Sequence, residues 1–381
     1  MSRPMKIDTL VFDANNWQLQ CNEIGNKAKA QLVLIFGDSD TVKLPHCYNS
    51  LHECYPEAHI VGASACGSIL GPEITSASAC ATAVHFNNAQ VAVSQVDFTS
   101  DDHLPSTAQQ LVAQLPKDSL KHVFVLADGL TISGSKLVRA LNQTDLAVPI
   151  TGGMAGDNDR FQETWIIADA PAKQSSIVAL GFYGDNLIIS SGCRAGWAPF
   201  GANRKITQSN ANVLYKLDNK PALDLYKEYL GDFAKDLPAS GLRFPLSIQE
   251  HDKAPWIIRG ILGIDEEAKS ILLAGDVPEG YTTRLMNANL NGLIDGANES
   301  AQCLKKANDK RALGLVVSCV GRRIVMKQLS EEELDAVKDV LGSNVQLNGF
   351  YSYGELSPFE NELLCCQLHN QTITLTAIYE K

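Results

Sequence analysis

The sequence predicts an α+β fold made of two lobes of largely antiparallel sheet packed with helices. Segments with the composition of β-strands outnumber those with helical periodicity. Many of them follow one another directly, so the strict alternation of strand and helix that builds parallel sheets is not the pattern here. The apolar content of 45% and the charged content of 20% are those of an ordinary globular protein.

The first half of the chain supplies strands and amphipathic helices. The run 32–36 is apolar throughout and predicts a buried strand, and the turn at 37–40 offers helix caps. Apolar residues at three- and four-residue spacing over 41–54 predict a helix. Segments on either side of Asn87 and Asn88 predict a hairpin, and three later strands predict a meander. The full expectation is strands at 7–13, 32–36, 59–63, 79–86, 90–98, 122–127, 163–169, 175–183 and 186–193, with helices at 41–54, 106–115 and 133–142.

The boundary between the lobes is expected where the periodic pattern weakens, between about 194 and 212, or slightly later at 218–220. The second half then begins with a helix, which has Pro221 at its first position and Gly231 after its end. The expected elements are helices at 221–230, 289–307 and 331–341, with extended segments at 243–248, 256–264, 270–274, 313–319 and 373–377.

Charge and composition exclude several classes of partner. The formal net charge is −11, and lysine and arginine form no long run, so the basic footprint that binds nucleic acids or anionic membranes is missing. The first residues lack the apolar core of a signal peptide, and no window approaches the roughly 18 apolar residues of a membrane span. Ten cysteines are scattered without a CxxC motif. The sequence predicts a cytoplasmic protein without nucleic-acid or membrane partners.

The densest group of functional side chains lies near the end of the chain. Glycines 349 and 354 permit close backbone approach, and the terminal alternation of apolar and polar residues predicts a half-buried strand. Side chains beside such elements can be aimed into one polar-aromatic pocket, while the alternative is a hydrogen-bond network that joins two strands. The candidates are Tyr351, Tyr353, Glu355, His369 and Asn370.

Two further segments are candidate ligand sites. Arg322, beside Arg323 at the end of a predicted strand, could bind a carboxylate through both guanidinium nitrogens. An ion pair with the acidic run 331–333 is the equally weighted alternative. The glycine-dense turn at 152–157, which includes Gly153 and Asp157, lacks the spacing of a nucleotide loop and is interpreted as a tight turn that lines a pocket.

Five stretches, taken in order, resemble landmarks of the FIST family, a ligand-sensing module of signalling proteins. The resemblance covers about residues 30–375 and implies an N-terminal segment 1–30, a FIST-N domain 31–219 and a FIST-C domain 220–381. The matching stretches are VGASACG (61–67), TGGMAGD (151–157), KPALDLYKEYLG (220–231), SCVGRR (318–323) and GFYSYGE (349–355), the last followed by LHNQT (368–372).

A FIST protein of this length resembles the nitric-oxide-sensing subgroup. That resemblance implies a non-enzymatic sensor that binds haem b, with nitric oxide as the signal, and regulates a partner histidine kinase or cyclic-di-GMP enzyme. His369 is the candidate haem ligand among the eight histidines. Two alternatives stay open. One is a FIST sensor of a small metabolite such as an amino acid, without haem, in which Arg322, Tyr353 and Glu355 recognise charged ends. The other is an enzyme that uses a pocket cysteine.

Overall fold

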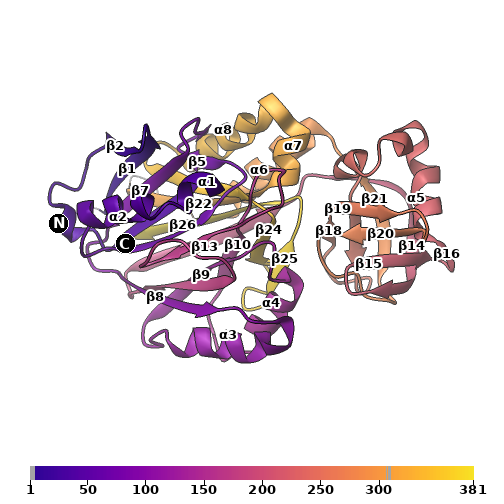
Figure 1. Ribbon diagram of the computed structural model, residues 1–381, viewed down its shortest axis with the longest axis horizontal. Helices are drawn as coiled ribbons and strands as arrows, with labels where there is room; N and C mark the ends of the chain where they lie inside the picture. Colours follow the sequence, from indigo (N-terminus) through magenta and orange to yellow (C-terminus); the bar gives the residue numbers. More distant parts are fainter. Residues whose placement is uncertain (1–4, 306, 308–309) are drawn as a thin grey trace.

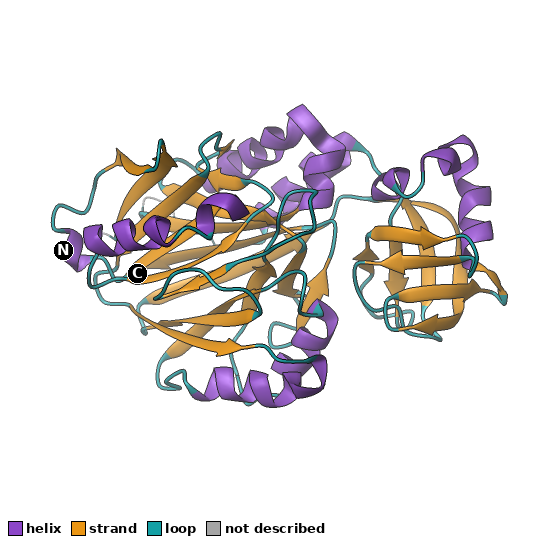
Figure 2. Cartoon of the chain, viewed as in Figure 1, coloured by secondary structure: helices purple, strands orange, loops and turns teal. Residues whose placement is uncertain are grey.

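The computed structural model describes residues 5–305, 307 and 310–381, and it divides into a large body and a small lobe (Figures 1 and 2). Three six-stranded sheets make up the body, and a fourth sheet makes up the small lobe at residues 198–287. Most neighbouring strands are antiparallel, so the predicted α+β class is confirmed.

Each sheet of the body combines strands that are distant in the sequence. The first has the order β11 (Ile166–Ala168), β4 (His59–Ser64), β3 (Leu32–Gly37), β7 (Ala79–His85), β1 (Lys6–Asp13), β2 (Asn16–Cys21). The second has the order β25 (Cys366–His369), β24 (Gly354–Pro358), β10 (Ile150–Met154), β9 (Leu120–Ala127), β12 (Ser176–Tyr183), β8 (Gln90–Asp97). The third has the order β13 (Leu187–Arg194), β26 (Ile373–Glu380), β22 (Ala312–Cys319), β23 (Val345–Ser352), β5 (Ser68–Leu70), β6 (Glu73–Ile74).

One apolar core joins the three sheets of the body. Phe36 of β3 stacks on Phe350 of β23, with ring centroids 4.6 Å apart, and Phe124 of β9 belongs to the same buried cluster. Their strands read as nearly continuous apolar runs because both faces of each central strand are covered. The three sheets therefore form one cooperative unit.

Amphipathic helices cover the outer faces of these sheets. Helix α2 (Pro45–Cys54) packs on the first sheet, α3 (Leu104–Ala113) and α4 (Gly134–Asn142) on the second, and α6 (Leu290–Gln302) and α8 (Ser330–Leu341) on the third. Short helices complete the body, namely α1 (Ser39–Val42), α7 (Val320–Met326), η1 (Lys27–Lys29), η2 (Asp101–His103) and η5 (Lys327–Leu329). Among the helices that the structure describes, none has the length and apolar character to cross a bilayer.

The small lobe has its own sheet and core. Its strand order is β18 (Ile257–Arg259), β17 (Leu246–Gln249), β21 (Thr282–Asn287), β14 (Ala198–Asn210), β15 (Val213–Leu217), β20 (Ser270–Leu273), β19 (Ile261–Asp265), with β16 (Lys220–Pro221) beside β15. Helix α5 (Ala222–Leu230) packs on it, followed by η3 (Gly231–Asp236) and η4 (Ala239–Arg243). A separate apolar cluster joins the lobe to the body through Trp197, Ile258, Met286, Leu293 and Met326.

Most predicted strands exist, but their predicted partners were often wrong. The strands around Asn87 and Asn88 form no hairpin, because β7 joins the first sheet and β8 the second. The predicted meander is also wrong, since β11, β12 and β13 lie in three different sheets. The weak pattern at 194–212 conceals β14, an exposed strand. The periodicity and composition of a segment indicate that it is a strand. The strand with which it pairs depends instead on which sheet buries its apolar face.

The small lobe is inserted between segments that build the body. Strands before it pair with strands after it, as β10 does with β24 and β13 with β26. The predicted boundary at 219–220 falls within the small lobe, at the paired strands β15 and β16. Residue 306, within the predicted helix 289–307, lies outside the described residues, and α6 ends at Gln302.

Phe350→Ala should lower the free energy of unfolding by about 3–5 kcal/mol, because it opens a cavity in the core that the three sheets share. Urea unfolding followed by circular dichroism measures the change. Phe233→Ala is the control, because Phe233 is 47% exposed in the small lobe. An equally small loss for both variants would contradict a single core for the body.

Candidate ligand site between the lobes

A pocket of about 790 Å³, here called the interlobe pocket, lies between the body and the small lobe. Its walls are mostly apolar, with a few polar groups, which is the composition of small-molecule sites. On the body side it is lined by residues 129–136 and 319–321 and by Met154, Tyr353, Leu368, Asn370 and Gln371. On the side of the small lobe it is lined by residues 211–212, 236–239, 260–262 and 274–276 and by Leu242.

The turn between β25 and β26 places one unpaired amide, that of Asn370, and one half-paired amide, that of Gln371, at the wall of this pocket. Asn370 and Gln371 are each 1% exposed. In the described part of the chain, neither amide atom of Asn370 has a hydrogen-bond partner, and Oε1 of Gln371 has none either. Buried polar groups are almost always paired, so such groups at a pocket wall indicate a place for a ligand.

The side chain of Glu355 in β24 anchors this turn through hydrogen bonds. Its carboxylate accepts hydrogen bonds from Ser352 Oγ (2.8 Å), from Thr372 N (3.2 Å) and from Thr372 Oγ1 (2.8 Å). Glu355 is fully buried, and burial raises its pKa to about 8 although these donors favour the charged form. The three donors fix the backbone on which Asn370 and Gln371 stand.

The same turn contacts the small lobe directly. Nε2 of Gln371 donates to the carbonyl oxygen of Leu242 (3.3 Å), and Nη1 of Arg259 donates to the carbonyl oxygen of Leu368 (3.0 Å). Trp197, just before the small lobe, donates from its indole to the carbonyl oxygen of Gln371 (2.8 Å). A change at the turn is therefore transmitted to the position of the lobe.

Four exposed apolar side chains line the interlobe pocket. Leu130, Phe161 and Ile324 belong to the body, Leu262 belongs to the small lobe, and their exposed fractions range from 37% to 50%. Phe161 stacks on Tyr353 with ring centroids 4.6 Å apart. Apolar groups left in water beside a pocket can be buried by a ligand or by closure of the lobes.

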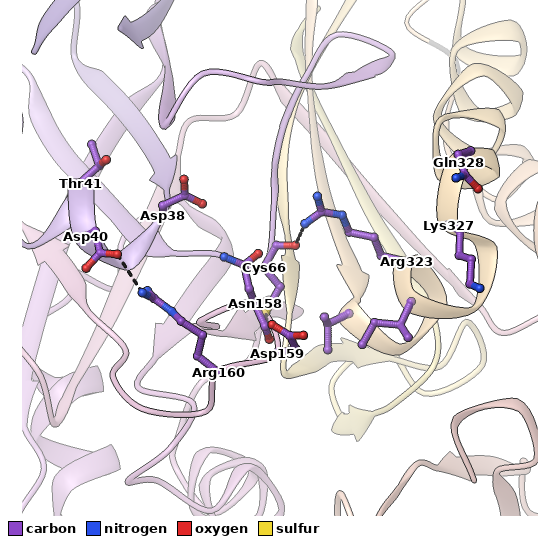
Figure 3. Close-up of a pocket in the computed structure, with 12 residues that line it drawn as sticks. Asp38, Asp40, Thr41, Cys66, Asn158, Asp159, Arg160, Arg323, Lys327 and Gln328 are labelled. Carbon is purple, nitrogen blue, oxygen red and sulfur yellow. Dashed lines mark hydrogen bonds and ion pairs between the residues drawn. The ribbon is translucent and has the colours of Figure 1, made fainter. Parts of the chain in front are cut away.

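A second pocket, of about 820 Å³ and here called the charged pocket, lies on the body and shares Asp159, Val320 and Ile324 with the first (Figure 3). Its arginines are engaged within the protein. Arg160 donates to Asp40 (2.8 Å), and Arg323 donates to the carbonyl oxygen of Cys66. Both arginines therefore already have acceptors within the protein, whereas Lys327, which also lines this pocket, has no ion pair among the described residues.

The sequence candidates separate into two groups in the structure. Tyr353 and Asn370 line the interlobe pocket together, with Glu355 behind them. His369 lines neither pocket. Its Nε2 lies 3.0 Å from the carbonyl oxygen of Ser357, and burial lowers the pKa of its imidazole to about 4. His369 is thus a neutral side chain within the sheet.

Arg322 and Tyr351 belong to a buried network around the carboxylate of Glu333. Arg322 pairs with Glu333 (2.8 Å) and donates to the carbonyl oxygen of Leu293 (2.8 Å), and Tyr351 donates to the same carboxylate (2.8 Å). The predicted pairing of Arg322 with the 331–333 run therefore exists, but it is fully buried rather than on the surface.

Gly153 and Asp157 have structural roles in the body. A Cβ at Gly153 would come within 2.6 Å of the side chain of Val317, so glycine allows β10 to approach the third sheet. Asp157 accepts hydrogen bonds from Ser39 Oγ (2.6 Å) and from Arg160 Nε (3.0 Å), and these bonds lower its pKa against burial. Its turn leads into the Asn158–Arg160 wall of the charged pocket.

Sequence reasoning missed the partners that complete the interlobe pocket. Gln371 stood in the quoted stretch but was not singled out, and it adopts a positive φ of 60° that no pattern announces. Of residues 129–136, which form a loop and the capped start of α4, only 133–136 were predicted, as the start of the helix 133–142, and 129–132 were assigned to no element. On the side of the small lobe, residues 260–262 lie in the predicted extended segment 256–264, whereas residues 236–239 were assigned to no element. Clustered glycines 129, 134, 260, 275 and 321 were the one available signal, because glycine permits close approach to a ligand.

Comparison with known proteins identifies the family. The FIST N domain matches residues 31–220, and the FIST C domain matches residues 222–358. The chain belongs to the FIST family. FIST domains are sensor modules of signal transduction that bind small ligands, and they are sensory rather than catalytic.

Individual relatives are distant. The chain is 25% identical over 258 residues to the uncharacterized protein MJ1623 of Methanocaldococcus jannaschii, a match that covers 61% of this chain and 49% of that protein. It therefore spans about half the length of this relative. Among solved structures, a cyanuric acid hydrolase from A. caulinodans is similar over 99% of both chains, with a TM-score of 0.36 and 9% identity. Similarity at that level assigns no reaction.

Arg322→Ala should lower the free energy of unfolding by about 3–5 kcal/mol, because it leaves the Glu333 carboxylate buried without its cation. Urea unfolding measures this loss, and Lys305→Ala on the exposed surface is the control, expected to change it by no more than about 0.5 kcal/mol. A ligand-binding Arg322 would instead show near-normal stability with reduced affinity.

Glu355 predicts a pH dependence with a definite sign. Its pKa is about 8 in the folded chain and close to the ordinary 4.5 in the unfolded chain, so the folded state binds more protons between these values. Stability should fall as the pH rises through this window, by up to about 1.4 kcal/mol per pH unit. Glu355→Gln removes the titration, so urea unfolding of this variant should show a flatter pH profile. Equal slopes in the two proteins would mean that Glu355 is not the responsible group.

Proposed function

We propose that this FIST protein is a sensor of a small metabolite, which binds in the interlobe pocket and fixes the small lobe against the body. The observation that carries the proposal is the turn of Asn370 and Gln371, which lines the pocket with three unpaired amide atoms and whose other bonds reach both lobes. Occupancy of this site acts as a signal because it changes the surface that a partner meets.

The contacts of the turn explain how binding and lobe position are coupled. A ligand shifts a conformational equilibrium only if it binds the two states with different affinity. Here Gln371 would meet the ligand with one end of its amide and holds Leu242 of the small lobe with the other. Movement of the small lobe changes the wall formed by Gly260 and Leu262, so the closed state offers contacts that an open state lacks.

A sensory rather than catalytic role suits the chemistry of the pocket. Cys319 is the thiol that lines it, and burial together with the nearby Glu355 raises the pKa of this thiol well above its usual range. A thiol held in the protonated form is a poor nucleophile. The alternative of an enzyme that works through this cysteine therefore lacks an activated nucleophile.

The residues around His369 do not fit haem b. The ring is buried in the sheet, its Nε2 faces the carbonyl oxygen of Ser357, and its edge packs against Phe359 at a centroid distance of 5.0 Å. Among the described residues that line the interlobe pocket there is no histidine. Haem and nitric oxide stay predictions of the family resemblance, and so does a partner histidine kinase or cyclic-di-GMP enzyme. The metabolite hypothesis is the one that the pocket favours.

Gly260→Leu should abolish metabolite binding while the protein still folds. A Cβ at Gly260 meets nothing closer than 3.6 Å, and the rest of the leucine would extend toward Gln371 and fill the pocket. A thermal-shift screen against a metabolite panel that includes the amino acids should give a hit that raises the melting temperature of the original protein only.

Gly263→Leu is the matched control, because Gly263 is also free of close neighbours but does not line the pocket. A hit that binds the Gly260 variant unchanged would place the sensory site elsewhere. A Soret band after addition of haemin, lost in His369→Ala and shifted by nitric oxide, would instead support the haem hypothesis.

A further inference from the structure

We infer that the interlobe pocket recognises a neutral carboxamide or ureido group, with Asn370 and Gln371 as the residues that determine specificity. This inference rests on the proposed function and names the class of ligand for the same site. It follows from the free hydrogen-bonding atoms, from the pairing of nearby charges and from the apolar walls.

The free atoms form a mixed set of donors and acceptors. Asn370 offers an unpaired Nδ2 donor and an unpaired Oδ1 acceptor, and Gln371 adds an unpaired Oε1 acceptor. Exchange of nitrogen and oxygen within the Asn370 amide leaves one donor and one acceptor side by side. The planar –CO–NH₂ end of a carboxamide or ureido group complements such a pair, because its carbonyl acceptor and one of its N–H donors lie on the same side.

The charges around the pocket do not favour a charged ligand group. Asp101 pairs with Lys136 (2.7 Å), and Asp276 pairs with Arg139 (2.7 Å). Oδ1 of Asp101 is unpaired and can accept one more N–H, although its carboxylate is already neutralised. Asp159 and Asp236 also line the pocket and have no ion pair among the described residues, but both are exposed, so water screens their charge. A carboxylate or ammonium brought to the Asn370 turn would lose its hydration without gaining a buried counter-ion, whereas a neutral amide loses much less.

Two glycines leave space for the Gln371 amide at the pocket wall. A Cβ at Gly321 would lie 2.6 Å from Nε2 of Gln371, so a larger residue would displace this amide. A Cβ at Gly260 of the small lobe would lie 3.6 Å from the same Nε2. The amide is thus enclosed between the body and the lobe, and its free Oε1 is available to the ligand.

The remainder of the ligand should be apolar. Leu130, Phe161, Leu262 and Ile324 leave much of their surface in water around this pocket. Burial of such surface provides most of the affinity of small-molecule sites, while a few polar groups fix orientation. The geometry therefore favours a molecule with an amide head and an apolar body.

The test compares three molecules of the same length, hexanamide, hexanoate and hexylammonium, at neutral pH. Isothermal titration calorimetry should show binding of hexanamide, and binding of the two charged molecules at least tenfold weaker. Asn370→Leu, which keeps the shape but removes the donor and the acceptor, should weaken hexanamide binding by at least tenfold. It should also raise the melting temperature of the free protein, because an unpaired buried amide is replaced by an apolar group.

Gln371→Met provides a second variant if the leucine variant fails to fold, and it should also weaken hexanamide binding. Equal or tighter binding of hexanoate or hexylammonium, absence of hexanamide binding, or unchanged affinity in both variants would overturn the inference. If Gly260→Leu abolishes binding of a screened metabolite while both amide variants retain it, the sensory pocket stands and amide recognition falls. If neither class of variant affects that metabolite, the proposed function falls as well.

Discussion

The interaction on which the site depends is the contact between the buried carboxylate of Glu355 and the backbone and hydroxyl of Thr372. It joins β24 of the second sheet to the start of β26 in the third, and so it fixes the short turn between β25 and β26. A carboxylate in such a place is costly, as its raised pKa shows. These bonds fix the backbone of the turn that presents Asn370 and Gln371 at the pocket wall.

The topology explains why this platform lies between the lobes. Strand β24 pairs with β10 from the first half of the chain, which brings the turn next to the start of α4. The small lobe leaves the body just after Trp197, and the indole of Trp197 donates to the carbonyl oxygen of Gln371. Segments from three parts of the sequence therefore meet at one turn, and the inserted lobe closes the fourth side of the pocket.

Much of this could be predicted from the sequence, but only where the cause is local. Alternation and apolar runs located most strands, and of the five side chains expected to share one pocket, Tyr353 and Asn370 line the interlobe pocket. Strand partners were not predictable, because β7 and β8 are separated by a short turn and yet enter different sheets. Whether a polar residue faces a pocket or a partner is equally non-local. In the sequence Arg322 and Tyr351 resemble site residues. Only the fold shows that both side chains bind the carboxylate of Glu333.

The distribution of unfavourable features supports the same location for function. Within Glu355 and the segment 369–372, the protein holds a buried carboxyl group with a raised pKa, three unpaired buried amide atoms and a non-glycine residue at a φ of 60°. Each feature costs folding free energy, on the order of 1–3 kcal/mol for an unpaired buried group or a strained backbone. Local rules are usually broken where a protein performs its function, and the surrounding structure compensates for the cost. The apolar core of the body provides that compensation, because β25 and β26, which anchor the turn at both ends, each contribute to buried clusters of the body.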